Sequence, residues 1–340
     1  MTKLGVLFSV LGVGAGCIPA FAQKQLPNII VMLSDDQGWG DLGFTGNTFV
    51  QTPNIDRIAH EGTILENFYV CPVSSPTRAE FLTGRYHVRS CVNSTTGGGE
   101  RFNLGEKTIA EYFREAGYAT SLFGKWHSGT QYPYHPNARG FEEFYGFCSG
   151  HWGNYWNPVL EHNGEIISGE GFIIDDLTDK ALDYIRDHKE HPFFMFLSYN
   201  TPHSPMQVPD SWWNRVKDRT LSQRATFPEQ EDTTFTKAAL ALAENLDWNI
   251  GRVLSLLHSL DLEQETIVIY FSDNGPNSFR WNGGMKGRKG STDEGGVRSP
   301  FCIRWPGHIR KGAVETQLSG AIDLIPTLLG LAGIEYTPLR

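Results

Sequence analysis

Cysteine is scarce in this chain of 340 residues, which contains five in total. Four of them, Cys71, Cys91, Cys148 and Cys302, form no CxxC pair and have no histidines at zinc-finger spacing. The pattern therefore does not indicate a zinc module, although a ligand role for any one cysteine is the less favoured alternative. Each of the four is expected to be a small buried hydrophobic residue. A Cys71–Cys91 bridge is the alternative in an oxidising compartment.

Positive charge is also in short supply, with 29 Lys and Arg against 38 Asp and Glu and a formal net charge of −9. A general nucleic-acid binder needs a basic footprint, so no nucleic-acid partner is expected. Hydrophobic residues make up 40 % of the chain and charged residues 20 %, which favours a large buried core over a disordered chain. The body of the chain has no apolar run long enough for a transmembrane segment.

The first 22 residues have the pattern of a secretory signal peptide. Lys3 supplies a positive start, residues 4–18 are mostly apolar, and residues 20–22 read AFA, a small-x-small cleavage site. The sequence thus predicts a signal peptide at 1–22, a mature domain at 23–340 and a protein that is exported, whether periplasmic, cell-surface or secreted. A buried N-terminal helix is the alternative, and lipidation at Cys17 is a weaker one because the expected aliphatic residue before it is missing.

Apolar patterning predicts alternating strands and helices without a linker or an internal repeat. Continuous apolar runs indicate strands buried on both faces, and 3.6-residue periodicity indicates helices. The expected strands are 28–33, 118–123, 193–199, 266–272 and 301–303, and the expected helices are 52–59, 108–116, 177–185, 235–260 and 323–331. This alternation predicts an α/β fold with a mostly parallel central sheet flanked by helices on both faces.

Polar side chains follow four of these strands directly. In parallel sheets ligands bind at the carboxyl ends of the strands, so these residues are expected to meet at one edge. The four groups are Asp35 with Asp36, Lys125 with His127, His203, and Asp273 with Asn274.

The residues at this edge include hard oxygen donors. Asp35, Asp36 and Asp273 would repel one another without a cation between them, and Asn274 adds an amide oxygen. Oxygen-only ligation suits Ca²⁺ or Mg²⁺ and not zinc. For Asp35 and Asp36 taken alone, capping of the following turn is the alternative.

Cationic side chains form a second group, consisting of Arg78, Lys125, Lys289, His127 and His203. In an acidic protein such a local group indicates an anionic ligand, although any one of them could be a solvated surface charge. Ser74 lies two residues before Pro76, which suits the first turn of a helix, so Ser74 is expected at a helix N-terminus that favours anions. These residues leave open whether Ser74 is a nucleophile or a cap.

Residues 74–85, SSPTRAEFLTGR, resemble the signature of the formylglycine-dependent sulfatases of the alkaline-phosphatase-like superfamily. Five other segments resemble further motifs of that family in the family's order. They are 28–43 for the first metal motif, 124–127 (GKWH), 202–205 (PHSP), 272–275 (SDNG) for the second metal motif, and 289–296 (KGSTDEGG) for the lysine loop.

This resemblance implies a serine-type bacterial sulfatase, a sulfuric ester hydrolase in which Ser74 is oxidised to formylglycine by a radical maturase before export. It implies a calcium site, with Mg²⁺ less favoured, made by Asp35, Asp36, Asp273, Asn274 and the modified Ser74. The hydrated aldehyde would attack sulfur, with Arg78, Lys125 and Lys289 stabilising the developing charge. His203 is expected as the acid for the leaving alcohol and His127 as the base, although the two roles could be exchanged.

Aromatic and amide side chains in 151–157, 212–213 and 281–282 suit sugar rings, although packed loops would give the same pattern. We therefore expect a sulfated sugar or glycan as substrate in preference to a small aryl sulfate, with His151 and Arg280 contacting it.

Two other readings stay open at this point. One is a phosphodiesterase or phosphonate hydrolase on the same scaffold, and the other is a non-catalytic sulfoglycan-binding protein with an unmodified Ser74. The smaller C-terminal subdomain that is usual in the family is expected to be missing, because the sequence stops soon after the last helix.

Overall fold

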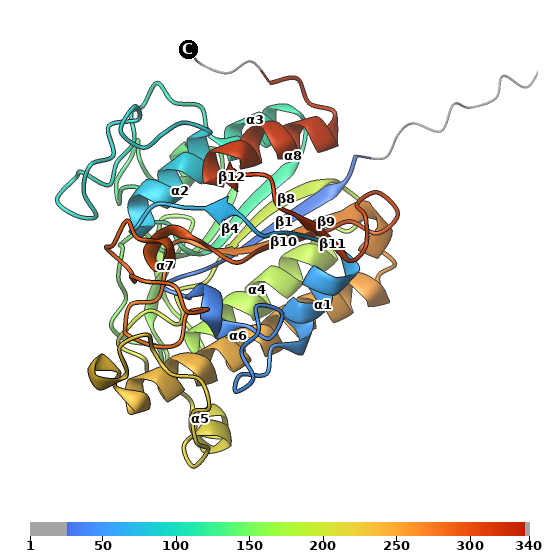
Figure 1. Cartoon of the computed structure of the whole chain (residues 1–340). Coiled ribbons are helices and arrows are strands. Elements are labelled where there is room, and N and C mark those ends of the chain that lie inside the picture. Colours follow the sequence, from blue (N-terminus) through green and yellow to red (C-terminus); the bar gives the residue numbers. More distant parts are fainter. Residues whose placement is uncertain (1–25, 337–340) are drawn as a thin grey trace, which may run out of the picture.

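A computed structural model describes residues 26–336 as a ten-stranded sheet enclosed between two layers of helices (Figure 1). The signal peptide expected at 1–22 lies outside the described residues. The strand order is β11-β2-β10-β9-β1-β8-β4-β5-β6-β7, and β12 pairs with β3 in a separate two-stranded sheet. The strands are β1 (Asn28–Ser34), β2 (Thr63–Leu65), β3 (Phe68–Tyr69), β4 (Ala119–Lys125), β5 (Glu143–Phe147), β6 (Val159–His162), β7 (Glu165–Ser168), β8 (Phe193–Ser198), β9 (Thr266–Ser272), β10 (Phe301–Arg304), β11 (Ala313–Glu315) and β12 (Ser319–Gly320).

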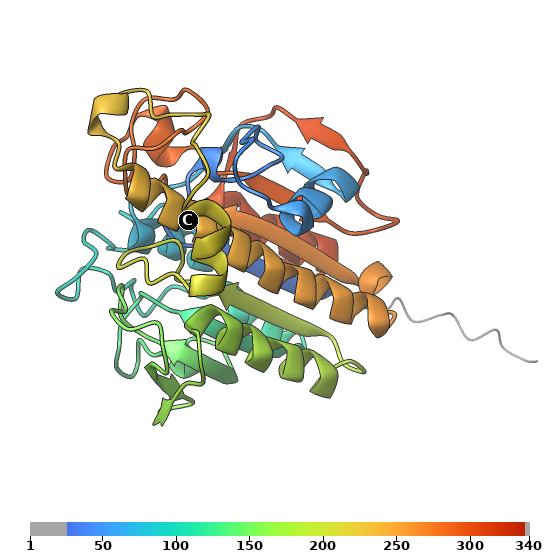
Figure 2. The same cartoon turned by 90° about the horizontal axis from the view of Figure 1, so that it is seen from below.

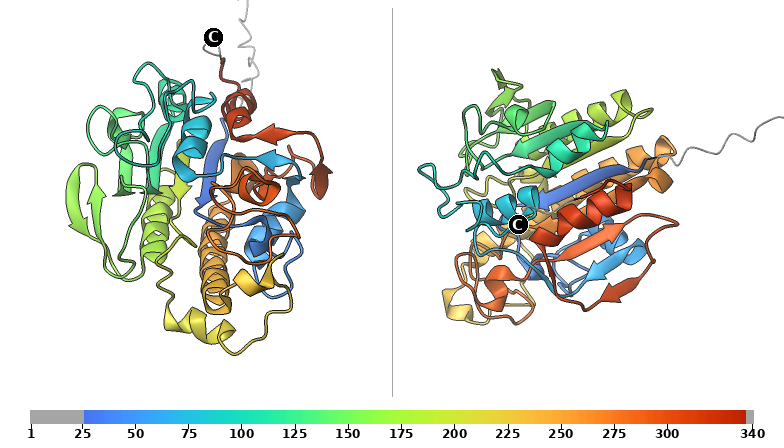
Figure 3. Two further views of the ribbon diagram at one scale, coloured as in Figure 1. Left: turned by 60° about the vertical axis from the view of Figure 1, so that its left-hand side comes forward. Right: turned by 90° about the horizontal axis from the view of Figure 1, so that it is seen from above.

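The five central strands run parallel in the order β9-β1-β8-β4-β5. β10 and the β6–β7 hairpin add antiparallel strands on the two sides, and the hairpin forms one border of the sheet (Figure 3). Because β1, β4, β8 and β9 are parallel neighbours, their carboxyl ends meet at one edge of the sheet.

Helices cover both faces of the sheet, as the alternating pattern predicts. In Figure 1, α2, α3 and α8 lie above the sheet, and α1, α4 and α6 lie below it. Seen from below, α4 and α6 run side by side along the strands (Figure 2). The helices are α1 (Pro53–Glu61), α2 (Ser74–Thr83), α3 (Ile109–Glu115), α4 (Ile173–Asp187), α5 (Asp210–Val216), α6 (Thr233–Ser259), α7 (Glu294–Val297) and α8 (Leu324–Ala332). No helix within residues 26–336 is both long and apolar enough to cross a lipid bilayer.

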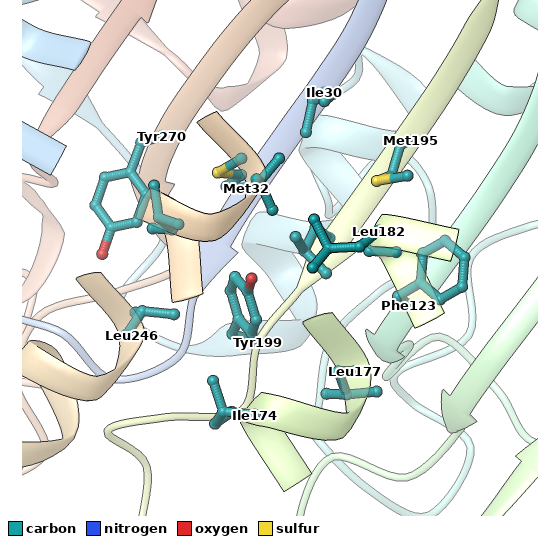
Figure 4. Close-up of a cluster of buried hydrophobic side chains, with 14 of the residues drawn as sticks. Ile30, Met32, Phe123, Ile174, Leu177, Leu182, Met195, Tyr199, Leu246 and Tyr270 are labelled. Carbon is teal, nitrogen blue, oxygen red and sulfur yellow. The ribbon is translucent and has the colours of Figure 1, made fainter. Parts of the chain in front are cut away.

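Alternate residues of β1 enter two separate cores, one on each face. Ile29 and Val31 belong to the core beneath α2, α3 and α8, whereas Ile30 and Met32 belong to the core toward α4 and α6. Figure 4 shows Ile30 and Met32 facing side chains of those two helices. A strand buried on both faces reads as a continuous apolar run, which is why β1 could be recognised without alternation.

The expected core strands and helices are all present, with shifts at their ends. The helix expected at 177–185 is α4, which begins at Ile173. Its start was missed because Asp175 and Asp176 in the first turn interrupt the apolar pattern. Thr108 caps α3 by accepting a hydrogen bond from the backbone N–H of Glu111. β5 and the shorter strands β2, β3, β6, β7, β11 and β12 were not predicted, because with two to five residues each they show no clear period.

The expectations for the cysteines need two corrections. Cys71 and Cys91 are both free thiols, so the alternative of a bridge between them is wrong. Cys91 is exposed, whereas Cys71, Cys148 and Cys302 are buried as expected. The Cys71 thiol contacts the ring of His87, with Sγ and Nδ1 3.3 Å apart.

Candidate active site

The carboxyl ends of β1, β4, β8 and β9 and the N-terminus of α2 meet at one place. Ser74 is the first residue of α2 and is 2 % exposed. Its hydroxyl lies 2.6 Å from Oδ2 of Asp273 and 3.2 Å from Oδ1 of Asp35. Nζ of Lys125 is 3.2 Å from the same hydroxyl, and Oδ1 of Asn274 is 3.4 Å from it. Residues as far apart in the chain as Asp35 and Asn274 thus converge on one oxygen atom.

Asp36 faces this cluster from a left-handed backbone conformation, with φ of 62°. Its Oδ1 accepts a hydrogen bond from Asn274 at 2.8 Å and lies 2.6 Å from Nζ of Lys289. Its Oδ2 is buried without a hydrogen-bond partner, and Nε2 of His203 is 3.5 Å away. A non-glycine residue held at positive φ is strained, so the surrounding contacts must hold this carboxylate in place.

The donor set of this cluster fits a hard divalent cation. Asp35, Asp36 and Asp273 are all at most 1 % exposed, and the amide oxygen of Asn274 lies beside them. A buried carboxylate oxygen without a partner is costly unless a cation binds it. His203 also lies within reach of Asp35 and Asp36, but the remaining donors are oxygens, which suit Ca²⁺ or Mg²⁺.

Arg78 lies beneath the cluster with its whole side chain buried. Its guanidinium donates to Oδ2 of Asp273 at 3.1 Å, to Oγ of Ser198 at 2.6 Å and to the carbonyl of Lys125 at 3.0 Å. The role of Ser198 was not predicted from the sequence. Its position at the end of β8 is the signal that could have identified it, since the same rule identified the other residues at this edge.

Burial and charge act against each other on the ionisable groups of the cluster. Burial alone would raise the pKa of Asp35, but the adjacent Lys125 and the cations around it hold that pKa well below its usual range. Burial, and then the charge of Asp35, raise the pKa of Asp273. Burial lowers the pKa of Lys125 against the opposing pull of Asp35. The two carboxylates that contact the Ser74 hydroxyl thus have pKa values shifted in opposite directions.

Lys289 approaches the cluster from the loop before α7, on the side of Asp36. Burial would lower the pKa of Lys289, but the Asp36 and Asp35 carboxylates raise it above its usual value. Its side chain is 25 % exposed, unlike those of Lys125 and Arg78. Lys289 is therefore the cation of this group that solvent and a ligand can reach most easily.

His127 lies just after β4 and is 4 % exposed, again at positive φ, 60°. Its Nε2 is 2.8 Å from the carbonyl oxygen of Thr95, so Nε2 carries the proton and donates it. Its Nδ1 is buried and has no partner, which leaves a free lone pair. Burial, and then the charge of Lys125, lower the pKa of His127 to about 3. The ring is therefore a neutral acceptor.

His203 and His151 lie at the opening of the site. Their ring centroids are 5.2 Å apart, with His203 half-buried and His151 exposed. The carbonyl of His203 accepts a hydrogen bond of 2.6 Å from the hydroxyl of Tyr155, which fixes the loop after β8. Burial and the neighbouring charge of His203 lower the pKa of His151.

Arg280, the second expected sugar contact, is buried and paired within the protein. Its side chain is 1 % exposed, and its guanidinium is paired with Asp41, with the two nearest atoms 2.7 Å apart. The remaining nitrogens donate to the carbonyl of Asp36, to Asn277 and to Ser278. All three guanidinium nitrogens of Arg280 are thus hydrogen-bonded within the protein, so the expected contact with a sugar would require Arg280 to leave one of these partners.

Residues 151–157 are mostly exposed, although two aromatic side chains of this segment are packed against the protein. Tyr155 is fully buried, and Trp152 stacks on Phe147 with centroids 5.1 Å apart. Trp156 differs, because it is 47 % exposed. In the other two segments, Trp212, Trp213 and Trp281 are each partly buried.

Comparison with known proteins agrees with this geometry. The profile of the Sulfatase family matches residues 27–334. The chain is 32 % identical to human N-acetylgalactosamine-6-sulfatase, in an alignment that covers 95 % of this chain and 64 % of the human protein. The chain thus spans about two thirds of the length of that relative.

Two solved structures are similar in both fold and sequence. The crystal structure of Ps i-CgsB in complex with k-i-k-neocarrahexaose has a TM-score of 0.81 and 32 % identity, covering 92 % of this chain and 73 % of that one. A sulfatase from a Bacteroides thetaiotaomicron locus for glycosaminoglycan metabolism has a TM-score of 0.80 and 26 % identity, covering 91 % and 73 %. The family match, the alkaline-phosphatase-like fold of these neighbours and the identity to the human relative place this chain in the sulfatase family.

Proposed function

We propose that this protein hydrolyses sulfate esters, with Ser74 as the residue that becomes the nucleophile after oxidation to formylglycine. The observation that carries the proposal is the position of the Ser74 hydroxyl, buried among Asp35, Asp273, Asn274 and Lys125. An unmodified serine is a poor nucleophile unless a general base lies beside it. The side chains within hydrogen-bond distance of Ser74 are two carboxylates, an amide and an ammonium group, the surroundings of a metal and anion site.

Two groups supply chemistry that the unmodified chain lacks. A hydrated formylglycine at position 74 would offer one hydroxyl to attack sulfur as the substrate alcohol leaves. Deprotonation of its second hydroxyl would then re-form the aldehyde while the C–O bond to sulfate breaks. A divalent cation, for which Ca²⁺ suits the oxygen ligands best, would supply Lewis-acid polarisation of a sulfate oxygen. Asp35, Asp36, Asp273 and Asn274 would hold that cation. A radical maturase is the proposed source of the modification, and the pattern of residues 1–22 supports the proposal that the protein is exported.

The cationic side chains of the site bind and stabilise the anion. Lys125 lies against position 74 and Lys289 against Asp36, so the two ammonium groups approach the cluster from different elements. Arg78 donates hydrogen bonds to Asp273, Ser198 and the carbonyl of Lys125. Its proposed role is to hold Asp273 in place and to neutralise negative charge at the bottom of the site. Fixed charges in a water-excluded site stabilise developing negative charge without reorganisation.

The two histidines have separate proton-transfer roles in this proposal. His127 has a free, buried Nδ1 lone pair, and this nitrogen is the proposed acceptor for the proton of the second hydroxyl. His203 is half-buried at the opening, where an ester oxygen would leave, and it suits the acid that protonates the departing alcohol.

We propose a sulfated sugar as the substrate. The name of the human relative and the oligosaccharide bound in the Ps i-CgsB crystal structure support this class, as does the exposed ring of Trp156. His151, exposed beside His203, is the proposed contact to the sugar.

The experiment is expression with a serine-type maturase, followed by mass measurement of the peptide that contains Ser74. Conversion lowers its mass by two hydrogens and creates a carbonyl that reacts with a hydrazide. Sulfate release is then measured on N-acetylgalactosamine 6-sulfate, on carrageenan oligosaccharides and on paired aryl sulfate and phosphate esters.

Ser74→Ala should abolish sulfate release. Ser75→Ala is the matched control, because the Ser75 hydroxyl donates to the carbonyl of Ser94 and not to the cluster. Full activity in Ser74→Ala would reject the assignment. Faster turnover of the phosphate esters would favour the phosphodiesterase reading, and tight sulfoglycan binding without turnover would favour a binding protein.

A further inference from the structure

A thiol, an imidazole and a carboxylate converge on α2 outside the candidate active site. Sγ of Cys71 lies 3.3 Å from Nδ1 of His87, and the same Nδ1 lies 2.8 Å from Oε1 of Glu80. The three ligand atoms all fall within 4.8 Å of one another. Neighbouring ligands around one tetrahedral metal ion are separated by distances of this order.

The backbone around α2 holds these side chains in place. The N–H of Cys71 donates to Oγ1 of Thr77 at 2.9 Å, and this hydrogen bond holds the segment before α2 against the side of the helix. Glu80 belongs to α2 itself. Gly84 ends the helix at a positive φ of 65°, and the N–H of His87 then donates to Oε1 of Glu80 at 3.2 Å. The site is therefore built by one short stretch of chain.

Burial and ligand chemistry both suit a soft transition metal. Cys71 and Glu80 are each 7 % exposed, so a thiol and a carboxylate face each other away from water. The His87 side chain is 28 % exposed, which leaves one side of the group open to solvent. A sulfur, nitrogen and oxygen set binds Zn²⁺ well, whereas the cluster around Ser74 offers mainly oxygen.

A second group has the same composition and consists of His135, Cys148 and Glu161. It shows that the tautomer of the histidine ring decides whether the group can bind a metal ion. The backbone N–H of Asn137 donates to Nδ1 of His135 at 3.3 Å, so the ring proton is held on Nε2, the atom that faces Glu161. Metal binding there would have to break this arrangement. In His87 the atom facing the cluster is Nδ1, and Nε2 has no hydrogen-bond partner among residues 26–336, so the ring proton is free to move to Nε2.

We propose that Cys71, Glu80 and His87 form a Zn²⁺ site, with water as the fourth ligand on the exposed side of His87. Binding releases the thiol proton of Cys71 to solvent. It also moves the ring proton of His87 from Nδ1 to Nε2 by exchange with solvent, so the metal gains a thiolate and a neutral imidazole. The ion would join the segment just before Ser74 to the last turn of α2. This assignment does not depend on the proposed sulfatase activity.

The test uses Co²⁺ as a spectroscopic substitute, with excess Ca²⁺ present to occupy the oxygen cluster. A thiolate ligand gives an intense ligand-to-metal absorption band in the near ultraviolet, which oxygen ligands do not give. We expect this band in the wild-type protein and its loss in Cys71→Ser. We also expect one equivalent of Zn²⁺ by equilibrium dialysis, with affinity lowered by roughly 100-fold or more in His87→Gln.

Two matched variants serve as controls. Cys148→Ser removes the thiol of the second group, and Cys91→Ser removes the exposed thiol, so both should keep the band. The proposal is overturned if wild type shows no band, if Cys71→Ser keeps it, or if either control loses it. Should Cys71→Ser fail to fold, His87→Gln decides the question, because its side chain is partly exposed and an unchanged Zn²⁺ affinity would reject the site.

Discussion

Arg78 and Asp273 form an ion pair of 3.1 Å in which neither side chain is exposed to solvent. Removing one partner leaves the other charge buried and unpaired, so Arg78→Met should lower the free energy of unfolding by about 3–5 kcal/mol. Urea denaturation measures this. Arg57→Met is the control, because the Arg57 side chain is 40 % exposed and its ion pairs should contribute less than about 1 kcal/mol. Equal losses in the two variants would contradict the prediction.

His127 should make the protein less stable in acid. Its pKa is about 3 in the folded protein and about 6.5 in an unfolded chain, so between these values the unfolded chain binds the extra proton. Stability is then lost as the pH falls, at up to about 1.4 kcal/mol per pH unit. His127→Gln should flatten the dependence of unfolding free energy on pH by that amount between pH 6 and 4. Parallel curves for wild type and variant would refute the depressed pKa.

Gly150 should be intolerant of any side chain. A Cβ at this position would lie 2.1 Å from Nε2 of His127, the atom that is hydrogen-bonded to the carbonyl oxygen of Thr95. Gly150→Ala should therefore displace the ring and lower kcat for sulfate release by on the order of 10-fold or more, the scale of a misplaced catalytic group. Gly153→Ala is the control, because a Cβ there meets its nearest atom at 4.0 Å. Similar kcat values in the two variants would count against the placement of His127.

A divalent cation should stabilise the fold through Asp36. At 100 times its dissociation constant, a ligand that binds only the folded state adds about 2.7 kcal/mol. Ca²⁺ should therefore raise the Tm of the wild type, and Asp36→Asn should lose most of this rise, because Oδ2 of Asp36 is buried without a partner. Asp210→Asn, on the exposed start of α5, should keep the response. A full response in Asp36→Asn would remove Asp36 from the ligand set.

Arg280 should affect stability and not substrate affinity. Arg280→Met leaves Asp41 buried without its partner and should lower the free energy of unfolding by about 3–5 kcal/mol, with KM for a sulfated sugar near the wild-type value. The double variant with Asp41→Asn should lose less than the sum of the two single variants. A large rise in KM with unchanged stability would restore the expectation of a sugar contact.

Much of the site was predictable because it follows a positional rule. Asp35, Lys125 and Asp273 come at the ends of apolar runs, and parallel strands bring such ends together. The left-handed backbone of Asp36 and the tautomer of His127 were not predictable, because both depend on contacts between segments far apart in the chain.

Arg280 shows what the sequence could not predict. Its place in a polar, aromatic loop suggested a ligand contact, but its partner Asp41 lies 239 positions away, and no local pattern indicates that pairing. The border strands escaped prediction for a related reason. Strands such as β2 are three residues long, and pairing with β10 and β11 defines them more than their own sequence does.

The burial of Ser74 has a consequence for the order of events during synthesis. Any enzyme that oxidises this side chain must reach it while the chain is still open, since in the finished fold it is 2 % exposed. Asn274 leaves the ribosome 200 positions later, so at about 5–20 residues per second the growing polypeptide leaves Ser74 unenclosed for roughly 10–40 s. On the proposed oxidation of Ser74, translation speed would set the interval in which this side chain can be reached, and slower translation through that stretch should raise the fraction of converted protein.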